Sequence, residues 1–242
     1  MRTLLITGAN SDIGLGIINR IANDFDKIIV HYFGDDQALL YLKEQYPQKI
    51  TVLEGDFSSE EKTEVFVNKV ISPDIEITDF IHLPAGTFKN IKFGKLTWSD
   101  FSRELEIGLR SLVLITNKLI PEMSKRKNGN IIVMLSSCTT NIPPKYISNY
   151  VTAKYALLGL VKALSTEYAD KGIRVNGISP TMIETKFLKE VPELLVQQNA
   201  ANSPTGNNLQ VSEVIPLFEF LLSDGSKAIT GQNISITNGN LM

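Results

Sequence analysis

The sequence contains few of the residues that build metal centres or disulfides. Its 242 residues include one cysteine, Cys138, and two histidines. A single cysteine cannot form an intramolecular disulfide, so we expect a reducing compartment, with the cytoplasm as the default location. So few sulfur and imidazole ligands also argue against a zinc or iron–sulfur site built by the protein, and we expect no metal site.

Long apolar runs and an excess of one charge are also absent. No stretch reaches the roughly 18–20 apolar residues that a membrane span needs, so we expect no membrane insertion. The first apolar run leads directly into a glycine turn at Gly8, which argues against a secretory signal. The net charge of −2 gives no electrostatic basis for nucleic acid as the main partner.

Short apolar runs alternate with longer helical patterns along the whole chain. Most of these runs carry Ile, Val and Leu on successive residues, which is typical of strands buried on both faces of a parallel sheet. The pattern predicts an α/β fold: a doubly wound parallel sheet in a three-layer α/β/α arrangement, forming a single domain over residues 1–242. The expected strands are Leu4–Thr7, Lys27–Tyr32, Ile50–Leu53, Phe80–Leu83, Asn130–Ser136, Arg174–Ser179 and Asn233–Thr237, and the expected helices begin near Ser11, Asp35, Ser58, Trp98, Tyr150 and Ser212.

One segment, from Pro180 to about Gln210, breaks this alternation. It contains further prolines, a glycine and paired asparagines, and it is too long for an ordinary connection between a strand and a helix. Long connections in compact domains are often lids or binding loops. We therefore expect a substrate lid at about 181–210, with a surface insertion of no function as the alternative.

The first expected strand ends in a glycine-rich turn that leads into a helix. Gly8 can adopt a positive φ, and Gly14 lets the backbone approach a ligand and pack against the sheet. The helix N-terminus then offers free N–H groups and a positive dipole end to a pyrophosphate. The position of the turn predicts a dinucleotide site, and the alternative is a tight turn without a ligand. The turn reads Thr7-Gly8-Ala9-Asn10-Ser11-Asp12-Ile13-Gly14-Leu15-Gly16.

A second motif pairs Tyr150 with Lys154 on an expected helix. Residues four apart share a helix face, so the phenol and the ammonium can point into one cleft. An adjacent ammonium stabilises a phenolate and lowers the pKa of the phenol, so that tyrosine can exchange a proton with a substrate oxygen near neutral pH. Ser137, thirteen residues before Tyr150, follows a buried strand and is expected to hydrogen-bond the same oxygen. The alternative is a purely structural Tyr and Lys.

Together the glycine turn and the Ser–Tyr–Lys spacing resemble the short-chain dehydrogenase/reductase family, over nearly the whole chain. The resemblance implies a Rossmann-like fold and an NAD(P)-dependent enzyme that transfers hydride to a ketone. It also implies that Ser137, Tyr150 and Lys154 are catalytic, and that Asp56 accepts a hydrogen bond from adenine. The cofactor-binding residues that it implies are Gly8, Asn10, Ser11, Ile13, Gly14, Tyr32, Asp56, Phe57, Ala85, Gly86, Tyr150, Lys154, Pro180, Ile183 and Thr185.

Three positions depart from the family pattern. Asp12 stands where a glycine is usual, and we expect its carboxylate to turn away from the pyrophosphate. Leu83-Pro84 replaces a pair of asparagines, and Gly108 replaces the helix asparagine that holds a water on the proton relay. These departures leave open a function of another class, a catalytically silent protein that binds a dinucleotide as a sensor or scaffold.

The sequence gives less direct evidence on the type of cofactor, the class of substrate and the oligomeric state. Tyr32 ends the second strand where an acid would bond the ribose hydroxyls of NAD, so the sequence favours NADP over NAD. Within the family the chain looks most like 3-oxoacyl-(acyl-carrier-protein) reductases, which implies a small-molecule or carrier-bound carbonyl substrate; a sugar or secondary-metabolite ketone is the alternative. Apolar residues in Trp98–Lys125 and Tyr150–Lys171 exceed what one sheet face covers, which predicts a homo-oligomer, a tetramer or dimer.

Overall fold

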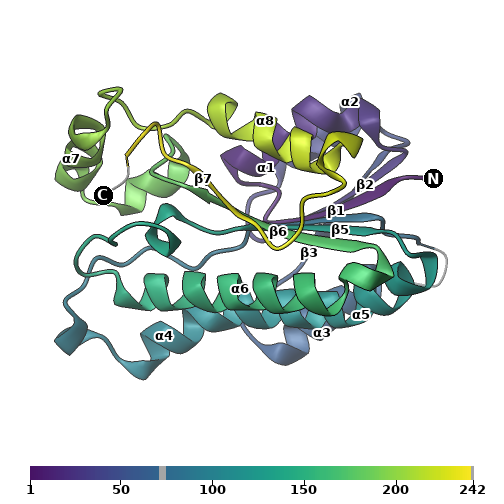
Figure 1. Cartoon of the computed structure of the whole chain (residues 1–242), viewed down its shortest axis with the longest axis horizontal. Coiled ribbons are helices and arrows are strands. Elements are labelled where there is room, and N and C mark those ends of the chain that lie inside the picture. Colours follow the sequence, from purple (N-terminus) through teal and green to yellow (C-terminus); the bar gives the residue numbers. More distant parts are fainter. Residues whose placement is uncertain (71–74, 241–242) are drawn as a thin grey trace.

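The computed structural model describes residues 1–70 and 75–240, and it contains one parallel sheet (Figure 1). The strand order is β3-β2-β1-β4-β5-β6-β7, so the direction of winding reverses between β1 and β4. In such sheets the crevice for ligands lies at this reversal, beyond the carboxyl ends of the strands. The strands are β1 (Thr3–Thr7), β2 (Lys27–Tyr32), β3 (Ile50–Glu54), β4 (Asp79–His82), β5 (Gly129–Met134), β6 (Ile173–Pro180) and β7 (Asn233–Ile236).

Helices cover both faces of the sheet. In Figure 1, α1, α2 and α8 lie on one face, whereas α3, α4, α5 and α6 lie on the other. The helices are α1 (Asp12–Ile21), α2 (Gln37–Gln45), α3 (Glu60–Val70), α4 (Trp98–Glu104), α5 (Ser111–Arg126), α6 (Ser148–Glu167), α7 (Glu193–Asn202) and α8 (Val211–Leu222). A π-helical stretch, Leu105–Arg110, joins α4 to α5.

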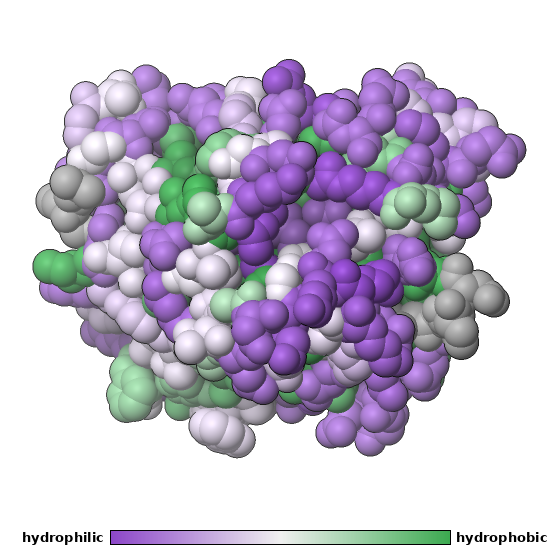
Figure 2. Space-filling model, turned by 45° about the vertical axis from the view of Figure 1, so that its right-hand side comes forward, coloured by the Kyte–Doolittle hydropathy of each residue, from purple (hydrophilic) through white to green (hydrophobic). Residues whose placement is uncertain are grey.

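The successive apolar residues of each strand supply two separate cores. In β1, Leu4 and Ile6 pack into the layer under α1 and α8, whereas Leu5 faces the layer under α3, α5 and α6. All three side chains are fully buried. Both faces of the sheet are therefore covered, which is why its strands carry apolar residues at successive positions and not only at alternate ones. On the face shown in Figure 2, hydrophilic residues predominate and hydrophobic ones form only small separate patches.

The predicted three-layer α/β fold is confirmed, and most element boundaries differ from the prediction by one or two residues. The fifth strand ends at Met134, before the predicted end at Ser136, because Ser136 caps a short 3-10 turn over Ser137–Thr139. In the described part of the chain, no helix is both long enough and apolar enough to cross a bilayer.

The segment from Pro180 to Gln210 is more ordered than its composition indicates. It contains a 3-10 turn, Lys186–Glu190, and the ten-residue helix α7. None of the residues of α7 is fully buried, so the helix lacks the apolar periodicity by which sequence patterns reveal helices. Its start directly after Pro192 is consistent with the preference of proline for helix N-termini.

Candidate active site

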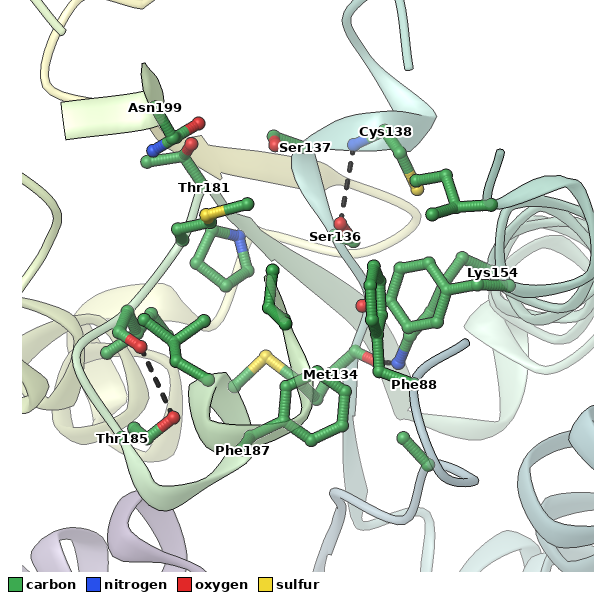
Figure 3. A pocket seen from close by; sticks show the side chains of 18 of the residues that line it. Phe88, Met134, Ser136, Ser137, Cys138, Lys154, Thr181, Thr185, Phe187 and Asn199 are labelled. Atoms are coloured by element: carbon green, nitrogen blue, oxygen red, sulfur yellow. Dashed lines mark hydrogen bonds between the residues drawn. The ribbon is translucent and has the colours of Figure 1, made fainter. Parts of the chain in front are cut away.

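A cavity of about 450 Å³ opens at the carboxyl ends of the strands. Its walls come from the turn after β1, from the loops after β4, β5 and β6, and from helices α6 and α7 (Figure 3). The structure thus brings together residues from both halves of the chain. The predicted site residues that line the cavity are Asn10, Ser11, Ile13, Ala85, Ser137, Tyr150, Lys154, Pro180, Ile183 and Thr185.

The glycine turn after β1 has the geometry of a phosphate cradle. Gly8 adopts φ +70°, and a Cβ on Gly14 would come to 2.5 Å from the carbonyl oxygen of Ala9. Both positions therefore require glycine. Ser11 caps α1: its hydroxyl accepts a hydrogen bond from the amide of Gly14 at 3.1 Å and donates one to the carbonyl of Gly8 at 2.8 Å. The turn and the helix N-terminus thus fit a dinucleotide pyrophosphate.

Asp12 pairs with the segment that the sequence predicted to be a lid. Its carboxylate accepts a hydrogen bond from the backbone amide of Lys186 at 2.7 Å, and the Lys186 ammonium lies 3.9 Å from its other oxygen. Both residues line the cavity. Asp12 therefore ties the glycine turn to the start of the 3-10 turn after β6, a contact between residues 174 positions apart.

Lys154 is buried, with only 4% of its surface exposed. Its ammonium donates a hydrogen bond to the carbonyl of Met134, at the end of β5, at 2.8 Å. Burial disfavours the charged form and lowers the pKa of Lys154 to about 8. Lys154 therefore remains mostly charged at neutral pH, held at the strand end beside Tyr150.

The pKa of Tyr150 shifts in the direction opposite to the one the spacing predicted. Burial raises the pKa of the phenol most, the neighbouring ionisable groups of Cys138 and Glu104 also raise it, and the Ser136 side chain lowers it. The Lys154 nitrogen lies 5.6 Å from the centre of the Tyr150 ring, and its charge does not outweigh the loss of water. The phenol is therefore protonated at neutral pH.

The serine that acts on the Tyr150 phenol is Ser136, which lowers the pKa of that phenol and which the sequence did not single out. Its hydroxyl also accepts a hydrogen bond from the amide of Cys138 at 3.4 Å. Ser137 lines the same cavity, but the two side chains leave the end of β5 in different directions (Figure 3). The pair Ser136-Ser137 was visible in the sequence, but only the 3-10 turn determines which hydroxyl faces the phenol.

Some predicted cofactor residues make other contacts. Asp56 accepts hydrogen bonds from the amide of Ser58 at 2.8 Å and from the ammonium of Lys62 at 2.7 Å. The ring of Phe57 is 5% exposed and stacks on His31 with ring centres 4.1 Å apart, so only its backbone is available to adenine. The predicted cofactor residues that do not line the cavity are Gly8, Gly14, Tyr32, Asp56, Phe57 and Gly86.

Two neutral histidines hold the strand ends in place. The amide of Gly8 donates a hydrogen bond to Nδ1 of His31 at 3.0 Å, and Nε2 of His31 donates to the carbonyl of Gly55 at 3.0 Å. Burial lowers the pKa of His31 to about 4 and that of His82 to about 3. His82, on β4, is a core residue whose ring nitrogens bond the hydroxyl of Thr7 at 2.9 Å and the carbonyl of Gly108 at 2.9 Å.

Gly108 lies on the π-helical stretch, and its carbonyl accepts a hydrogen bond from Nε2 of His82 at 2.9 Å. A Cβ at Gly108 would make only ordinary contacts, with a carbon of Leu157 at 3.6 Å. Packing therefore does not require glycine at this position.

Aromatic side chains that the sequence did not identify flank the phenol. Phe88, from the loop after β4, meets the ring of Tyr150 edge to face at 5.8 Å and that of Phe187 at 6.0 Å. Leu188, Val191 and Leu195 extend this apolar wall into the segment after β6. These residues show no periodic pattern, so only the fold reveals that they belong to one site.

Comparison with known families identifies this architecture. The family model described as enoyl-(acyl carrier protein) reductase matches residues 8–240. The chain belongs to the short-chain dehydrogenase/reductase family. As a member of this family it is an NAD(P)-dependent oxidoreductase, which agrees with the predicted reaction class and with the phosphate cradle at Gly8 and Gly14.

Individual relatives span the whole chain at low identity. An acetoacetyl-CoA reductase from Shinella zoogloeoides is 31% identical, covering 98% of this chain and 98% of the relative. A 3-oxoacyl-(acyl-carrier-protein) reductase from Thermotoga maritima is 27% identical, covering 98% and 97%. A solved structure of a 3-ketoacyl-(acyl-carrier-protein) reductase from Brucella melitensis complexed with NADH has a TM-score of 0.88 at 22% identity, covering 100% of this chain and 98% of that one.

Proposed function

We propose that this short-chain dehydrogenase/reductase reduces an apolar ketone of the 3-oxoacyl thioester type, with Tyr150 as the proton donor. The observation that carries the proposal is the position of Tyr150. It lies between the buried ammonium of Lys154 and the aromatic wall formed by Phe88 and Phe187. A proton donor and an apolar binding surface therefore meet at one point of the cavity.

The cofactor supplies the hydride when it is bound; the protein binds it, orients the substrate and provides the proton. The turn from Gly8 to Gly14 and the N-terminus of α1 would hold the pyrophosphate. The segment after β6, with the backbone of Ile183 and the hydroxyl of Thr185, would hold the nicotinamide end. Lys154 would reach the ribose next to the nicotinamide.

Tyr150 is suited to act as a general acid. Because burial raises the pKa of its phenol, the proton stays on Tyr150 until the carbonyl oxygen of the substrate gains negative charge. Transfer of that proton to the oxygen completes the reduction. Ser137 and Ser136 would hydrogen-bond the same oxygen or the phenol, and so hold the ketone in line with Tyr150.

The character of the walls favours an acyl chain over a sugar. A sugar needs several hydrogen-bonding partners, because buried hydroxyl groups left unpaired cost binding free energy. The wall around Phe88, Phe187 and Leu195 instead offers apolar contacts. The similarity to an acetoacetyl-CoA reductase and to 3-oxoacyl-(acyl-carrier-protein) reductases also supports a thioester substrate.

The choice of cofactor depends on the surroundings of Tyr32. The sequence favours NADP because Tyr32 replaces an acid. In the structure, however, loss of water raises the pKa of the Tyr32 phenol, and the neighbouring carboxylates of Asp36 and Glu54 raise it further. Two carboxylates beside the predicted ribose site would repel a 2′-phosphate. We therefore place NADH before NADPH in the proposal, contrary to the direction that Tyr32 alone indicates.

Two further expectations remain proposals. Residues 181–210 would act as a substrate lid, because α7 and the turn before it line the cavity and are tied to Asp12.

Helices α5 and α6 would pair between subunits of a dimer or tetramer. Tyr155 on α6 is 49% exposed, and Leu114 and Leu158 beside the core are only partly buried. Light scattering that shows only a monomer would contradict this assembly.

The sequence left open a catalytically silent protein that binds a dinucleotide, and one position supports it. Gly108 supplies no side chain to a relay, and its carbonyl is already bonded by His82. The complete Tyr150–Lys154 pair favours an enzyme.

One assay separates these functions. Turnover is measured with NADH and NADPH on 3-oxoacyl thioesters of increasing chain length, simple diketones and keto sugars. The proposal predicts that kcat/KM is highest for thioesters and rises with chain length. Activity restricted to keto sugars would contradict the substrate class. Cofactor binding without turnover on any substrate would support the silent alternative.

A further inference from the structure

Helix α7 presents two kinds of side chain to the cavity. Leu195, Gln198, Asn199 and Asn202 all line it. They lie on one face of the helix, because the last three follow Leu195 at spacings of three, four and seven residues. At about 1.5 Å per residue, Leu195 and Asn202 are roughly 10 Å apart along the helix. The face that α7 turns to the cavity therefore changes from apolar at its start to carboxamide at its end.

The apolar end continues through aromatic rings to the phenol. Phe187, just before α7 in the chain, meets Phe88 edge to face with ring centres 6.0 Å apart, and Phe88 meets Tyr150 at 5.8 Å. All three residues line the cavity. Phe187 is nevertheless 38% exposed. Part of its ring is thus left for a ligand to cover, and burial of apolar surface favours an apolar ligand.

The backbone on both sides of Phe187 is hydrogen-bonded. The amide of Lys186 donates to the carboxylate of Asp12 at 2.7 Å, and the amide of Leu188 donates to the carbonyl of Thr185 at 3.0 Å. A wall that is already in place loses less conformational entropy on binding than a mobile one. Phe187 can therefore select between ligands of different shape.

The polar end offers carboxamides to a ligand. The Asn199 side chain is engaged, since its Nδ2 donates to Oδ1 of Asn208 at 2.8 Å. The side chains of Gln198 and Asn202 make no hydrogen bond within residues 1–70 and 75–240, and both residues are exposed. A carboxamide donates and accepts hydrogen bonds, so it matches an amide group better than a methylene group. Figure 3 shows Asn199 and Phe187 at well-separated places in the lining.

The ketone of a 3-oxoacyl thioester carries two different substituents. One is an alkyl tail, and the other leads through the sulfur to an arm that contains amide groups. We propose that the cavity sorts these substituents: Phe187 receives the alkyl tail, whereas Gln198 and Asn202 receive the amide-bearing arm. The proposal rests on the proposed function and deepens it, because it fixes the orientation of the ketone against Tyr150. It makes these three side chains specificity-determining residues.

The test varies the tail and the arm independently. N-acetylcysteamine thioesters of increasing acyl chain length form the tail series, and the matching ethyl thioesters, which lack the amide group, form the arm series. The value of kcat/KM is measured for the 3-oxoacyl compounds. Dissociation constants are measured for the saturated acyl compounds, which have no ketone to reduce and so bind without turnover. Coenzyme A and acyl carrier proteins both carry the arm, and comparing their acetoacetyl thioesters identifies its source.

Phe187→Ala is expected to reduce the preference for long over short tails by about tenfold. The ring would cover one to two methylenes, and burial of each is worth about fourfold in binding. The preference for the amide-bearing arm is expected to stay that of the wild type, and Phe187→Leu is expected to restore most of the tail preference. Phe93→Ala is the matched control, because Phe93 is 71% exposed, pairs with Phe101 and lies outside the lining.

The double variant Gln198→Leu/Asn202→Leu removes both carboxamides and keeps side chains of similar size. It is expected to reduce the preference for the amide-bearing arm by about tenfold, as for loss of one or two hydrogen bonds, with the tail preference unchanged. Gln197→Leu is the matched control on the same helix. Its side chain donates to Glu193 at 2.9 Å, and Gln197 lies outside the lining.

Two results would overturn the proposal. An equal loss for all tails in Phe187→Ala would show that the ring only supports the fold. A loss of tail preference in the double leucine variant, with the arm preference intact, would show that the ketone binds in the opposite orientation. The saturated thioesters distinguish these results from a failure of the proposed function: without any turnover, their dissociation constants are still expected to show both preferences.

Discussion

The carboxylate of Asp12 accepts a 2.7 Å hydrogen bond from the backbone amide of Lys186. Asp12 occupies the first turn of α1, in the phosphate cradle, and Lys186 begins the 3-10 turn that leads to α7. One residue that departs from the family pattern therefore connects the two walls of the cavity. This contact ties the start of the segment after β6 to the glycine turn after β1.

The first prediction concerns this contact. Asp12→Ala removes the acceptor, so the amide of Lys186 is expected to exchange with solvent roughly tenfold faster, as for loss of one hydrogen bond to a partly exposed charged group. Hydrogen exchange with mass spectrometry over residues 186–190 measures this. Lys186→Ala keeps the backbone donor and serves as the control, with protection near that of the wild type. Equal protection in both variants would mean that Asp12 does not hold the segment.

The second prediction concerns stability in mild acid. His31 and His82 have their pKa values lowered by burial to about 4 and about 3, whereas an unfolded histidine titrates near pH ~6.5. As the pH falls through about 6.5, the unfolded chain binds protons that the folded chain does not, so folding stability is lost. Below that pH each histidine contributes a slope approaching about 1.4 kcal/mol per pH unit.

Urea denaturation at several pH values between 7 and 5 measures this slope. His82→Gln is expected to lower stability at neutral pH, because the carbonyl of Gly108 loses its hydrogen bond from Nε2 of His82. It is also expected to reduce the pH slope to that of one histidine. A stability that does not change over this range would show that the two rings are not kept neutral by burial.

The third prediction concerns cofactor choice. The carboxylates of Asp36 and Glu54 beside Tyr32 are expected to make NADH bind about tenfold more tightly than NADPH, a difference of about 1.4 kcal/mol. Asp36→Asn is expected to reduce the difference. Asp35→Asn is the control, because the Asp35 carboxylate caps the amide of Gln37. Titrations at one salt concentration measure both constants. Tighter binding of NADPH by the wild type would instead support the prediction from Tyr32 alone.

Sequence patterns predicted the parts of the molecule that depend on local rules. Successive Ile, Val and Leu residues predicted a sheet covered on both faces, and Gly8 and Gly14 predicted the cradle, because each reports a backbone requirement at its own position. The contact of Asp12 with Lys186 joins residues 174 positions apart, and no local rule contains it.

The errors at Tyr150 and Lys154 have the same origin. The spacing of Tyr150 and Lys154 predicted their proximity, but the direction of the phenol's pKa shift depends on how much water the fold removes. The aromatic wall of Phe88 and Phe187 likewise exists only once two distant loops meet at the strand ends.

The central claim is that Tyr150 donates the proton, and Tyr150→Phe tests it most directly. The variant keeps the ring against Phe88 and removes only the hydroxyl group. Tyr155→Phe, on the exposed side of the same helix, is the matched control. We measure kcat and the dissociation constant of the reduced cofactor for both. The account predicts that Tyr150→Phe lowers kcat by roughly 10²–10⁴-fold with cofactor affinity nearly unchanged, and that Tyr155→Phe changes neither. A Tyr150→Phe enzyme that retains more than about a tenth of the wild-type kcat would contradict it, since general acids contribute more than that.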